Sequence, residues 1–518
     1  MPINRLIPKR SIQELIAAQA KAFGNKTFLI YPEDHREITY TALDHWTAQV
    51  AHLIRKLKVD VKDFGSILMA NSPEFVFCYL GLMRAGCVAG PINIHLAAPE
   101  ITYILNHSES KVLFTTPEFL DRIESIRNQL KHLRHIVVVN APKQAQYIDF
   151  YKSLAALERS EREEPWVESS DEAMIIYTSG TTGKPKGVLL THENILIDAK
   201  NITDWFKFQP GDRLMCILPL FHVNGEIVTL MTPLYFGGSV VLNERFSASN
   251  FWQRIAGYKV NCFSTVPSIL SILLNNPGPE GLDLSFLRFA ICGAAPLPAE
   301  VQLQFEKTFG IPICEGFGLS ETTCYSSFNP LGKKRKVGSI GVEVGNEMAI
   351  MDDWDEELPS GDIGEIVVRG DNVMRAYFKD PVATRQAFRR GGWFSTGDLG
   401  THDEDGYFYI LDRKKEMINR GGEKVFPREV DEILFTHPKV KEVATFGVPD
   451  KIYGEEVKAY IVLKEGEHAS DEEIIQYCKQ HLAWFKCPKS VRFVGEIPKG
   501  PTGKILRREL TAKEKMAA

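Results

Sequence analysis

The sequence is poor in the features that mark several classes of protein. Its 518 residues include nine cysteines and no C-x-x-C pair, so neither a disulfide framework nor a zinc site is expected. The 61 Lys and Arg nearly balance the 66 Asp and Glu, and a net charge of −5 gives no reason to expect a nucleic acid or an anionic membrane as partner. The longest uncharged run, residues 227–243, contains Pro233 and Gly237 and falls short of the roughly 18 apolar residues of a membrane-spanning helix. We therefore expect reduced thiols, a cytoplasmic location and no integral membrane association.

Short apolar runs alternate with amphipathic segments along most of the chain. Met174–Tyr177 and Phe289–Cys292 have the length and composition of strands, whereas the apolar residues of segment 192–206 recur at helical spacing. The spacing of Ser11 and Glu14 is that of a capping box at the start of a first helix. Strands this apolar are typically covered on both faces. The pattern predicts an α/β protein with layered sheets in a large N-terminal body.

The pattern changes after residue 412, which predicts a second domain. Charged residues at 413–416 have the composition of a linker, and the following hundred or so residues have their own alternation, with strands expected at 443–448 and 457–463. We therefore expect an N-terminal domain over 1–412 and a small, mobile C-terminal α+β domain over 413–518.

The segment 177–187, Tyr-Thr-Ser-Gly-Thr-Thr-Gly-Lys-Pro-Lys-Gly, carries the clearest chemical signal. Its glycines allow backbone N–H groups to converge, its Ser and Thr hydroxyl groups add donors, and its two lysines add charge, which is the chemistry of a polyphosphate cradle. It is not a Walker A loop, because the glycine spacing differs and Pro185 follows Lys184, and the chain has no G-x-G-x-x-G fingerprint. Taken alone, the segment also fits a surface turn rich in Ser, Thr and Gly.

Seven later segments follow this loop in order. They are Leu218–His222, Gly293–Leu297, Glu315–Glu321, Trp393–Asp398, Asp412–Lys415, Asn419–Glu423 and Pro501–Lys504. Together with the loop they resemble the adenylate-forming superfamily of acyl-CoA synthetases, peptide-synthetase adenylation domains and firefly luciferase, and the resemblance covers nearly the whole chain. In that family a carboxylate attacks the α-phosphate of ATP to give an acyl-adenylate and pyrophosphate, and a thiol then displaces AMP. The resemblance implies an AMP-forming acid–thiol ligase that uses ATP, Mg²⁺ and coenzyme A.

The resemblance also implies roles for single residues. Lys504 would bridge the substrate carboxylate and the α-phosphate, Glu321 would be the catalytic magnesium ligand, and His222 would line the gate beside the carboxylate. His222 is not expected to be a general base, since the attacking carboxylate is already ionised at pH 7. Asp398 and Arg413 would contact the ribose. The remaining residues implied in the nucleotide site are Thr178, Ser179, Gly180, Thr181, Thr182, Lys186, Gly293, Ala294, Ala295, Glu315, Gly316, Phe317 and Ser320.

Further positions would serve the second half-reaction. By the same resemblance Lys415 occupies the hinge about which the small domain rotates, and Gly421 and Gly422 would allow close backbone approach to the pantetheine arm of coenzyme A. The basic run 332–336 is usually a solvated turn, although contact with the phosphates of coenzyme A is an alternative.

The acid itself is less well defined. The segments around His222, Val266 and Gly293–Ala295 contain no Lys or Arg that would pair with a second carboxylate, which favours an uncharged aliphatic or simple aromatic acid. Within the family the motifs are most similar to ligases of small or medium acids, such as carnitine/crotonobetaine and oxalate CoA ligases. The alternatives are a medium- or long-chain fatty-acyl-CoA ligase and an adenylating enzyme that loads a carrier protein in trans. A non-catalytic nucleotide-binding protein and a luciferase-like oxygenase are further alternatives.

Overall fold

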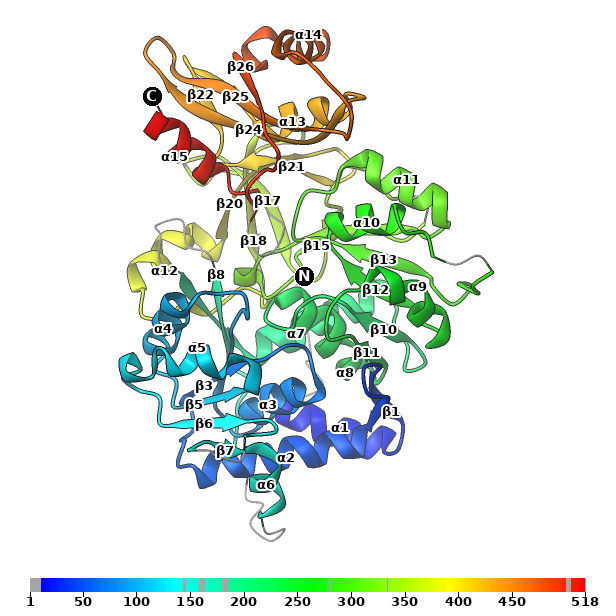
Figure 1. Ribbon diagram of the computed structural model, residues 1–518, viewed down its shortest axis with the longest axis vertical. Coiled ribbons are helices and arrows are strands. Elements are labelled where there is room, and N and C mark those ends of the chain that lie inside the picture. The colour runs from blue at the N-terminus through cyan, green and yellow to red at the C-terminus, as the bar shows by residue number, and fades with distance from the viewer. Residues whose placement is uncertain are drawn as a thin grey trace. The chain divides into compact units, whose positions relative to one another are not determined.

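The computed structural model describes residues 11–142, 146–157, 164–178, 185–278, 281–332, 334–499 and 505–517. The chain divides into two compact units, which we describe separately (Figure 1). Unit 1 comprises Met1–Arg335, Gly341–Glu347 and Val368–Phe388, and unit 2 comprises Lys336–Ile340, Met348–Val367 and Arg389–Ala518. The predicted α/β class, with a large N-terminal body and a smaller C-terminal part, is confirmed.

Unit 1 contains two large sheets. In sheet order, the nine strands of the first are β16 (Val342–Glu343), β15 (Ser327–Phe328), β14 (Ile313–Phe317), β13 (Phe289–Cys292), β12 (Cys262–Thr265), β10 (Arg213–Cys216), β11 (Ser239–Leu242), β1 (Thr27–Tyr31) and β2 (Arg36–Thr39). The eight strands of the second are β19 (Ala376–Tyr377), β9 (Lys186–Thr191), β8 (Glu172–Thr178), β4 (Val88–Pro91), β3 (Phe64–Leu68), β5 (Val112–Thr115), β6 (His135–Val138) and β7 (Ile148–Asp149). Most neighbours pair in parallel, and the central strands are fully buried, as their apolar composition predicts.

The helices of unit 1 connect and cover these strands (Figure 1). They are α1 (Ile12–Phe23), α2 (Tyr40–Lys56), α3 (Pro73–Arg84), α4 (Ala98–His107), α5 (Leu120–Glu124), α6 (Phe150–Ala155), α7 (His192–Phe206), α8 (Thr232–Phe236), α9 (Ala248–Gly257), α10 (Pro267–Leu274), α11 (Ala299–Phe309) and α12 (Pro381–Ala387). The predicted capping box is confirmed, since Ser11 and Glu14 each accept a hydrogen bond from the other's backbone N–H. The helix expected at 192–206 is α7, which begins after its cap, Thr191.

The long uncharged run at 227–243 is divided among several elements. It comprises most of a π-helix (Asn224–Met231), then α8 and β11, and the chain turns at Gly237 with a φ of +79°. Within the described parts of the chain, no helix is both long enough and apolar enough to cross a membrane. All nine cysteines are buried free thiols, as expected.

Unit 2 contains two smaller sheets. The first has β17 (Glu347–Met351), β18 (Gly364–Arg369), β20 (Phe394–His402) and β21 (Phe408–Arg413). The second has β23 (Glu423–Val425), β22 (Ile418–Arg420), β25 (Gly454–Leu463) and β24 (Val440–Asp450), with β26 (Ser490–Phe493) beside β25. Its helices are α13 (Pro427–Phe435), α14 (Asp471–His481) and α15 (Arg507–Ala517). The strands expected at 443–448 and 457–463 lie within β24 and β25, which pair antiparallel.

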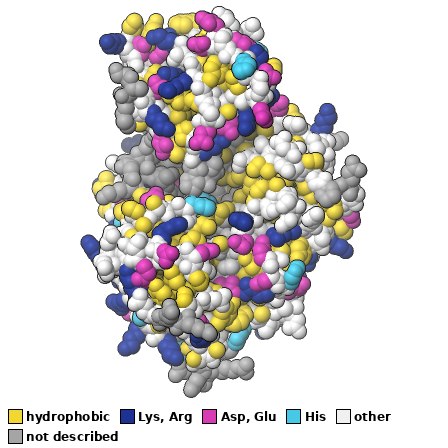
Figure 2. All heavy atoms as spheres, in the orientation of Figure 1, with side chains coloured by type: hydrophobic (Ala, Val, Ile, Leu, Met, Phe, Trp, Pro, Cys, Tyr) yellow, Lys and Arg dark blue, Asp and Glu magenta, His cyan; other side chains and the backbone are white. Residues whose placement is uncertain are grey.

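Charged side chains of both signs are interspersed on the face of the molecule drawn in Figure 2. This mixture agrees with the nearly balanced composition, and on this face it forms no broad basic surface of the kind that binds nucleic acids.

Candidate active site

Two of the predicted segments lie at the carboxyl ends of adjacent parallel strands in unit 1. Residues 293–295 follow β13, and residues 315–321 include the end of β14; the strand register places Cys292 beside Glu315. The carboxyl ends of parallel strands are where α/β sheets usually bind ligands. Ala294 has a φ of +67°, which is uncommon for a residue with a Cβ and is typical of functional sites.

Glycines in these segments are required by the protein packed behind them. A Cβ at Gly293 would overlap the hydroxyl group of Tyr325, and a Cβ at Gly316 would overlap the ring of Phe328. The Tyr325 hydroxyl accepts a hydrogen bond of 3.0 Å from the Asn224 amide, which fixes the ring. The wall behind the strand ends is therefore rigid and neutral.

Lys186 and Glu321 are brought together by a residue that the sequence did not single out. The Tyr377 hydroxyl donates a hydrogen bond of 2.9 Å to Oε1 of Glu321, and Nζ of Lys186 lies 4.6 Å from the centroid of the Tyr377 ring. The backbone N–H of Met374 donates to the Glu321 carbonyl over 2.7 Å, and β19 pairs with β9. Burial, and then the negative charge of Glu321, raise the pKa of Tyr377. Ser320 and Glu321 begin a 3₁₀ turn next to this group.

The start and the end of the predicted phosphate loop are both anchored by α4. Thr178 and Lys186 are register partners across the β8–β9 hairpin. The His107 ring forms a hydrogen bond of 2.9 Å with the Tyr177 hydroxyl, and the Tyr103 hydroxyl donates to the Pro185 carbonyl over 3.1 Å. Ser179, Gly180, Thr181 and Thr182 lie outside the described residues. Sequence reasoning missed Tyr103 and His107, which stand at i and i+4 on one face of a helix that shows no link to the loop in sequence.

The predicted gate residue is a neutral histidine. Burial, and then the nearby His95, lower the pKa of His222 to about 4, so its ring carries no charge at pH 7. The His222 and Phe221 rings meet at a centroid distance of 4.8 Å. Phe317, predicted beside adenine, lies in the same unit and is 7% exposed, and Glu315 is buried.

Unit 1 also contains two fully buried carboxyl groups, whose burial the sequence did not indicate. Glu226 is in the π-helix that follows His222, and Asp198 is in α7, where it accepts a hydrogen bond of 3.2 Å from the Tyr325 backbone N–H. Among the described residues, no Lys or Arg forms an ion pair with either one. Burial raises the pKa of both groups well above the ordinary range and so favours their neutral forms.

In unit 2 the residues predicted to contact ribose meet as a pair. Asp398 and Arg413 are register partners across β20 and β21, and Nε of Arg413 lies 2.5 Å from Oδ1 of Asp398. Asp398 is only 3% exposed, and the Arg413 guanidinium compensates its charge within the protein.

The predicted glycine pair in unit 2 forms the turn between β22 and β23. Gly421 and Gly422 have φ values of +62° and +98°, a region that favours glycine. The Gly421 N–H donates to the Tyr453 carbonyl and the Gly422 N–H to the Asn419 side chain, over 2.8 and 3.0 Å. Lys504, the predicted catalytic lysine, lies outside the described residues.

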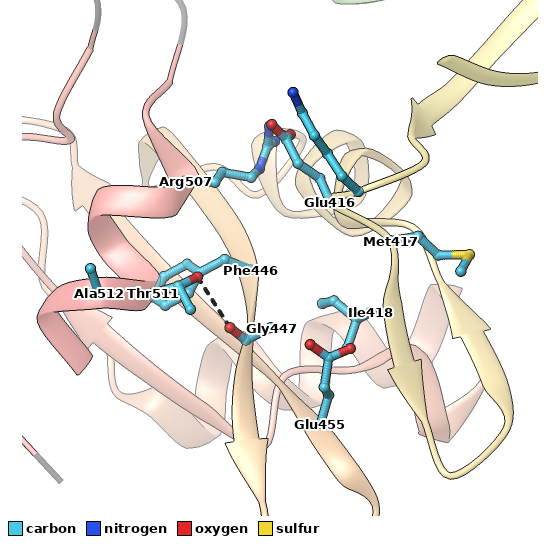
Figure 3. Close-up of a pocket in the computed structure, with 10 residues that line it drawn as sticks. Glu416, Met417, Ile418, Phe446, Gly447, Glu455, Arg507, Thr511 and Ala512 are labelled. Carbon is cyan, nitrogen blue, oxygen red and sulfur yellow. Dashed lines mark hydrogen bonds and ion pairs between the residues drawn. The ribbon is translucent and has the colours of Figure 1, made fainter. Parts of the chain in front are cut away.

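A cavity of about 280 Å³ in unit 2 lies next to the predicted hinge residue (Figure 3). Its lining comprises Lys415, Glu416, Met417, Ile418, Phe446, Gly447, Glu455, Arg507, Thr511 and Ala512. Figure 3 shows Glu416 and Arg507 facing each other. Nη1 of Arg507 lies 3.3 Å from Oε2 of Glu416, and Arg507 also pairs with Asp431. The guanidinium charge of Arg507 is therefore neutralised within the protein.

Two described residues of the basic run 332–336 form ion pairs within the protein. Arg335 pairs with Glu306 over 2.6 Å, and Lys336 pairs with Asp403 and Asp405 over 2.7 and 2.6 Å. These ion pairs compensate the positive charge locally, which favours the interpretation as a solvated turn over a phosphate contact.

Comparison with known proteins agrees with the geometry of both units. The sequence profile of the AMP-binding enzyme family matches residues 16–378, and that of the AMP-binding enzyme C-terminal domain matches residues 429–504. Sulfoacetate–CoA ligase of Cupriavidus necator is 38% identical over 503 residues, which cover 96% of this chain and 97% of that protein. Oxalate–CoA ligase of Arabidopsis thaliana is 36% identical, with 88% and 90% covered.

Solved structures show the same relationship. The anthranilate CoA ligase AuaEII in complex with anthranoyl-AMP superimposes with a TM-score of 0.89 at 31% identity, and 98% of each chain is covered. The resemblance to adenylate-forming enzymes, and to CoA ligases of small acids in particular, is thereby confirmed. The chain belongs to the AMP-binding enzyme family.

Proposed function

We propose that this chain is an AMP-forming carboxylic acid–CoA ligase. It converts a carboxylic acid and ATP to an acyl-adenylate and pyrophosphate, and it then transfers the acyl group to the thiol of coenzyme A with release of AMP. The observation that carries the proposal is the meeting of Lys186 and Glu321 at Tyr377, beside the hairpin that holds the phosphate loop. The curated relatives named as CoA ligases and the family match over both parts of the chain support it.

The first half-reaction brings two anions, the substrate carboxylate and the phosphates of ATP, close together. At about 4 Å and an effective dielectric constant near 20, one pair of like charges costs about 4 kcal/mol, so cations must converge on the phosphates. We assign this work to Lys186 for the outer phosphates and to Lys504 for the point where the carboxylate meets the α-phosphate. The remaining predicted residues keep the roles that the resemblance implies, with Asp398 and Arg413 on the ribose. As part of the proposal, the C-terminal domain over 413–518 changes its position between the two half-reactions.

Glu321 fits the magnesium ion that this chemistry requires. Mg²⁺ takes one or two carboxylate oxygens from the protein and completes its octahedral shell with phosphate oxygens and water. Glu321 is a single carboxylate in the same group as Lys186. The described parts of the chain contain no cluster of three or more His, Cys, Asp or Glu residues for a metal, which agrees with an ion held partly by ATP. When bound, Mg²⁺ neutralises charge on the phosphates.

The side chains described around the strand ends favour a small or medium acid without a second negative group, in contrast to the sulfoacetate and oxalate for which two relatives are named. His222 is neutral at pH 7, burial raises the pKa of Asp198 and Glu226 and favours their neutral forms, and the Tyr325 and Asn224 side chains carry no charge. A second anionic group on the substrate would find no compensating cation among them. A panel of acids from acetate to palmitate, with carnitine, oxalate and benzoate, scored by AMP release, tests this part of the proposal.

The two half-reactions separate the proposal from its alternatives. We expect Lys504→Ala to lower pyrophosphate release about 10²–10³-fold, as for other preorganised charges, while thioester formation from supplied acyl-adenylate survives. Lys479→Ala, which changes an exposed lysine in α14, is the matched control and leaves both half-reactions intact. An equal loss of both half-reactions in Lys504→Ala would contradict the assigned role.

The thiol acceptor and the location complete the proposal. Comparing thioester formation on coenzyme A with that on a phosphopantetheine-loaded carrier protein distinguishes a CoA ligase from an enzyme that loads a carrier. We propose a cytoplasmic location, where nine free buried thiols remain reduced and ATP is available.

A further inference from the structure

We propose that Tyr377 is a positioning residue that orients the carboxylate of Glu321 for magnesium and holds Lys186 beside it. The inference rests on the proposed function and deepens it, because it names the residue that relates the metal ligand to the phosphate-binding cation. All three residues lie in unit 1.

The hydroxyl group of Tyr377 fixes one oxygen of the carboxylate. It donates a hydrogen bond of 2.9 Å to Oε1 of Glu321. A carboxylate that is held through one oxygen has a defined plane, which sets the direction of its second oxygen toward an incoming ion. Outer partners of this kind commonly change metal affinity or activity 10–100-fold when they are removed.

The ring of Tyr377 faces the second group. Nζ of Lys186 lies 4.6 Å from the ring centroid, within the range of a cation–π contact. A long lysine side chain has several accessible rotamers, and an aromatic face restricts the ammonium group to one side of the hairpin. One tyrosine therefore contacts both a cation and an anion that must act on the same polyphosphate.

The backbone around Tyr377 forms hydrogen bonds with the segments that carry Lys186 and Glu321. Ala376 and Tyr377 pair with Leu189 and Val188 of β9, and the Phe378 N–H donates to the Gly187 carbonyl. On the other side, the Met374 N–H donates to the carbonyl group of Glu321 itself. The position of the tyrosine is thus determined by the strand that carries Lys186 and by the turn that carries Glu321.

Tyr377→Phe removes the hydroxyl group and keeps the ring. We expect the affinity for Mn²⁺, measured by electron paramagnetic resonance with α,β-methylene-ATP present, to fall about 10–100-fold. The half-saturating Mg²⁺ concentration for pyrophosphate release rises by the same factor, and KM for ATP at saturating metal stays within about twofold. Tyr377→Leu also removes the ring, so KM for ATP rises even at saturating metal.

The control is a matched bond far from the site. Tyr147→Phe removes a hydrogen bond of 2.6 Å to Oε1 of Glu124, the same chemical pair, and leaves Mn²⁺ binding unchanged. Wild-type metal affinity in Tyr377→Phe, with weakened affinity in Glu321→Gln, overturns the inference and leaves the metal ligand in place. Wild-type affinity in Glu321→Gln overturns both the inference and the proposed magnesium ligand.

Discussion

Two buried carboxyl groups of unit 1 and two of unit 2 are held in opposite ways. In unit 1, Asp198 and Glu226 are fully buried near the strand ends, and within the described chain neither forms an ion pair with a Lys or Arg. In unit 2, Glu365 and Glu456 are nearly as buried, but each contacts an arginine: Arg389 lies 2.6 Å from Glu365, and Arg420 lies 2.5 Å from Glu456. Among these four groups, the two of unit 1 have no cationic partner in the described chain and the two of unit 2 are each paired with an arginine.

The difference suits what each unit does. In the proposed function unit 1 binds ATP and a carboxylate, and an ionised acid behind the strand ends would repel both. Burial raises the pKa of Asp198 and Glu226, which favours their neutral forms and reduces that repulsion. Unit 2 has small sheets, and Arg389 and Arg420 compensate carboxylates that lie within β18 and β25. A buried pair is costly to break, because one charge is then left without compensation.

The largest expected effect comes from breaking an ion pair of unit 2. The Arg389 and Glu365 side chains are 10% and 6% exposed, and Arg389 also donates to Ser395 over 2.8 Å. Because Arg389→Leu leaves a buried carboxylate with less compensation, we expect a loss of about 3–5 kcal/mol in the free energy of unfolding. Hydrogen exchange read by mass spectrometry assigns the loss to peptides of unit 2.

The control for this change is an exposed pair. Arg369→Leu removes a contact of 2.5 Å with Glu347 in which both side chains are exposed, and the expected loss is below about 1 kcal/mol. If Arg389→Leu costs no more than Arg369→Leu, the arginine pairs do not stabilise unit 2 in the way described.

Acidification provides a second test, which acts on unit 1. His192 is fully buried, its Nδ1 accepts from the Ile12 backbone N–H, and burial lowers its pKa to about 4. Between pH 6.5 and 4 the unfolded chain binds a proton that the folded chain does not, so stability falls as the pH falls. At pH 5 the expected contribution is a loss of about 2 kcal/mol relative to neutral pH.

Urea unfolding at pH 7 and pH 5, for the wild type and for His192→Asn, measures this contribution. Asparagine keeps an acceptor for the Ile12 N–H but does not titrate, so the variant loses about 2 kcal/mol less than the wild type on acidification. Equal losses in the two proteins would show that His192 is already protonated in the folded state, or that it titrates normally there.

The smallest expected effect concerns an acid of unit 1. Glu226→Met replaces a buried carboxyl group, whose pKa is raised by burial, by an unbranched apolar side chain of similar length. Because no partner is left behind, we expect the free energy of unfolding to stay within about 1 kcal/mol of the wild type or to rise. Thermal unfolding of Glu226→Met and Glu226→Gln measures it, and a loss above about 2 kcal/mol would indicate an ionised carboxylate with a partner.

Local sequence patterns were sufficient to predict individual helices and strands and to identify the phosphate loop. The cap at Thr191 and the apolar period of 192–206 define α7 because both signals lie within the helix itself, and the Gly, Ser, Thr and Lys content of 177–187 marks the phosphate loop. The family motifs predicted that Glu321 and Lys186 belong to the site. In unit 2 they predicted Asp398 and Arg413, which the β20–β21 register brings into contact.

Contacts between distant segments could not be read in the same way. Tyr377 reaches Glu321 and Lys186 only because the two-residue strand β19 adds to the edge of a sheet whose next strand lies almost 190 residues earlier in the chain. Glutamate is usually found at the protein surface, so the sequence does not indicate that Glu226 is buried. Its burial follows from the helices and strands packed around the π-helix. Residues 348–367 also cluster with the C-terminal part of the chain, through sheet pairing that no local pattern encodes.

The nine buried sulfur atoms have a consequence for the fate of the activated acid. A mixed anhydride with AMP acylates any thiolate that reaches it, and burial raises the pKa of every cysteine of this chain, so that each remains an inert thiol. The enzyme therefore does not compete with its own acceptor for the acyl group. A colour reagent for accessible thiols, added to the native enzyme with coenzyme A, would report the consumption of the cofactor alone.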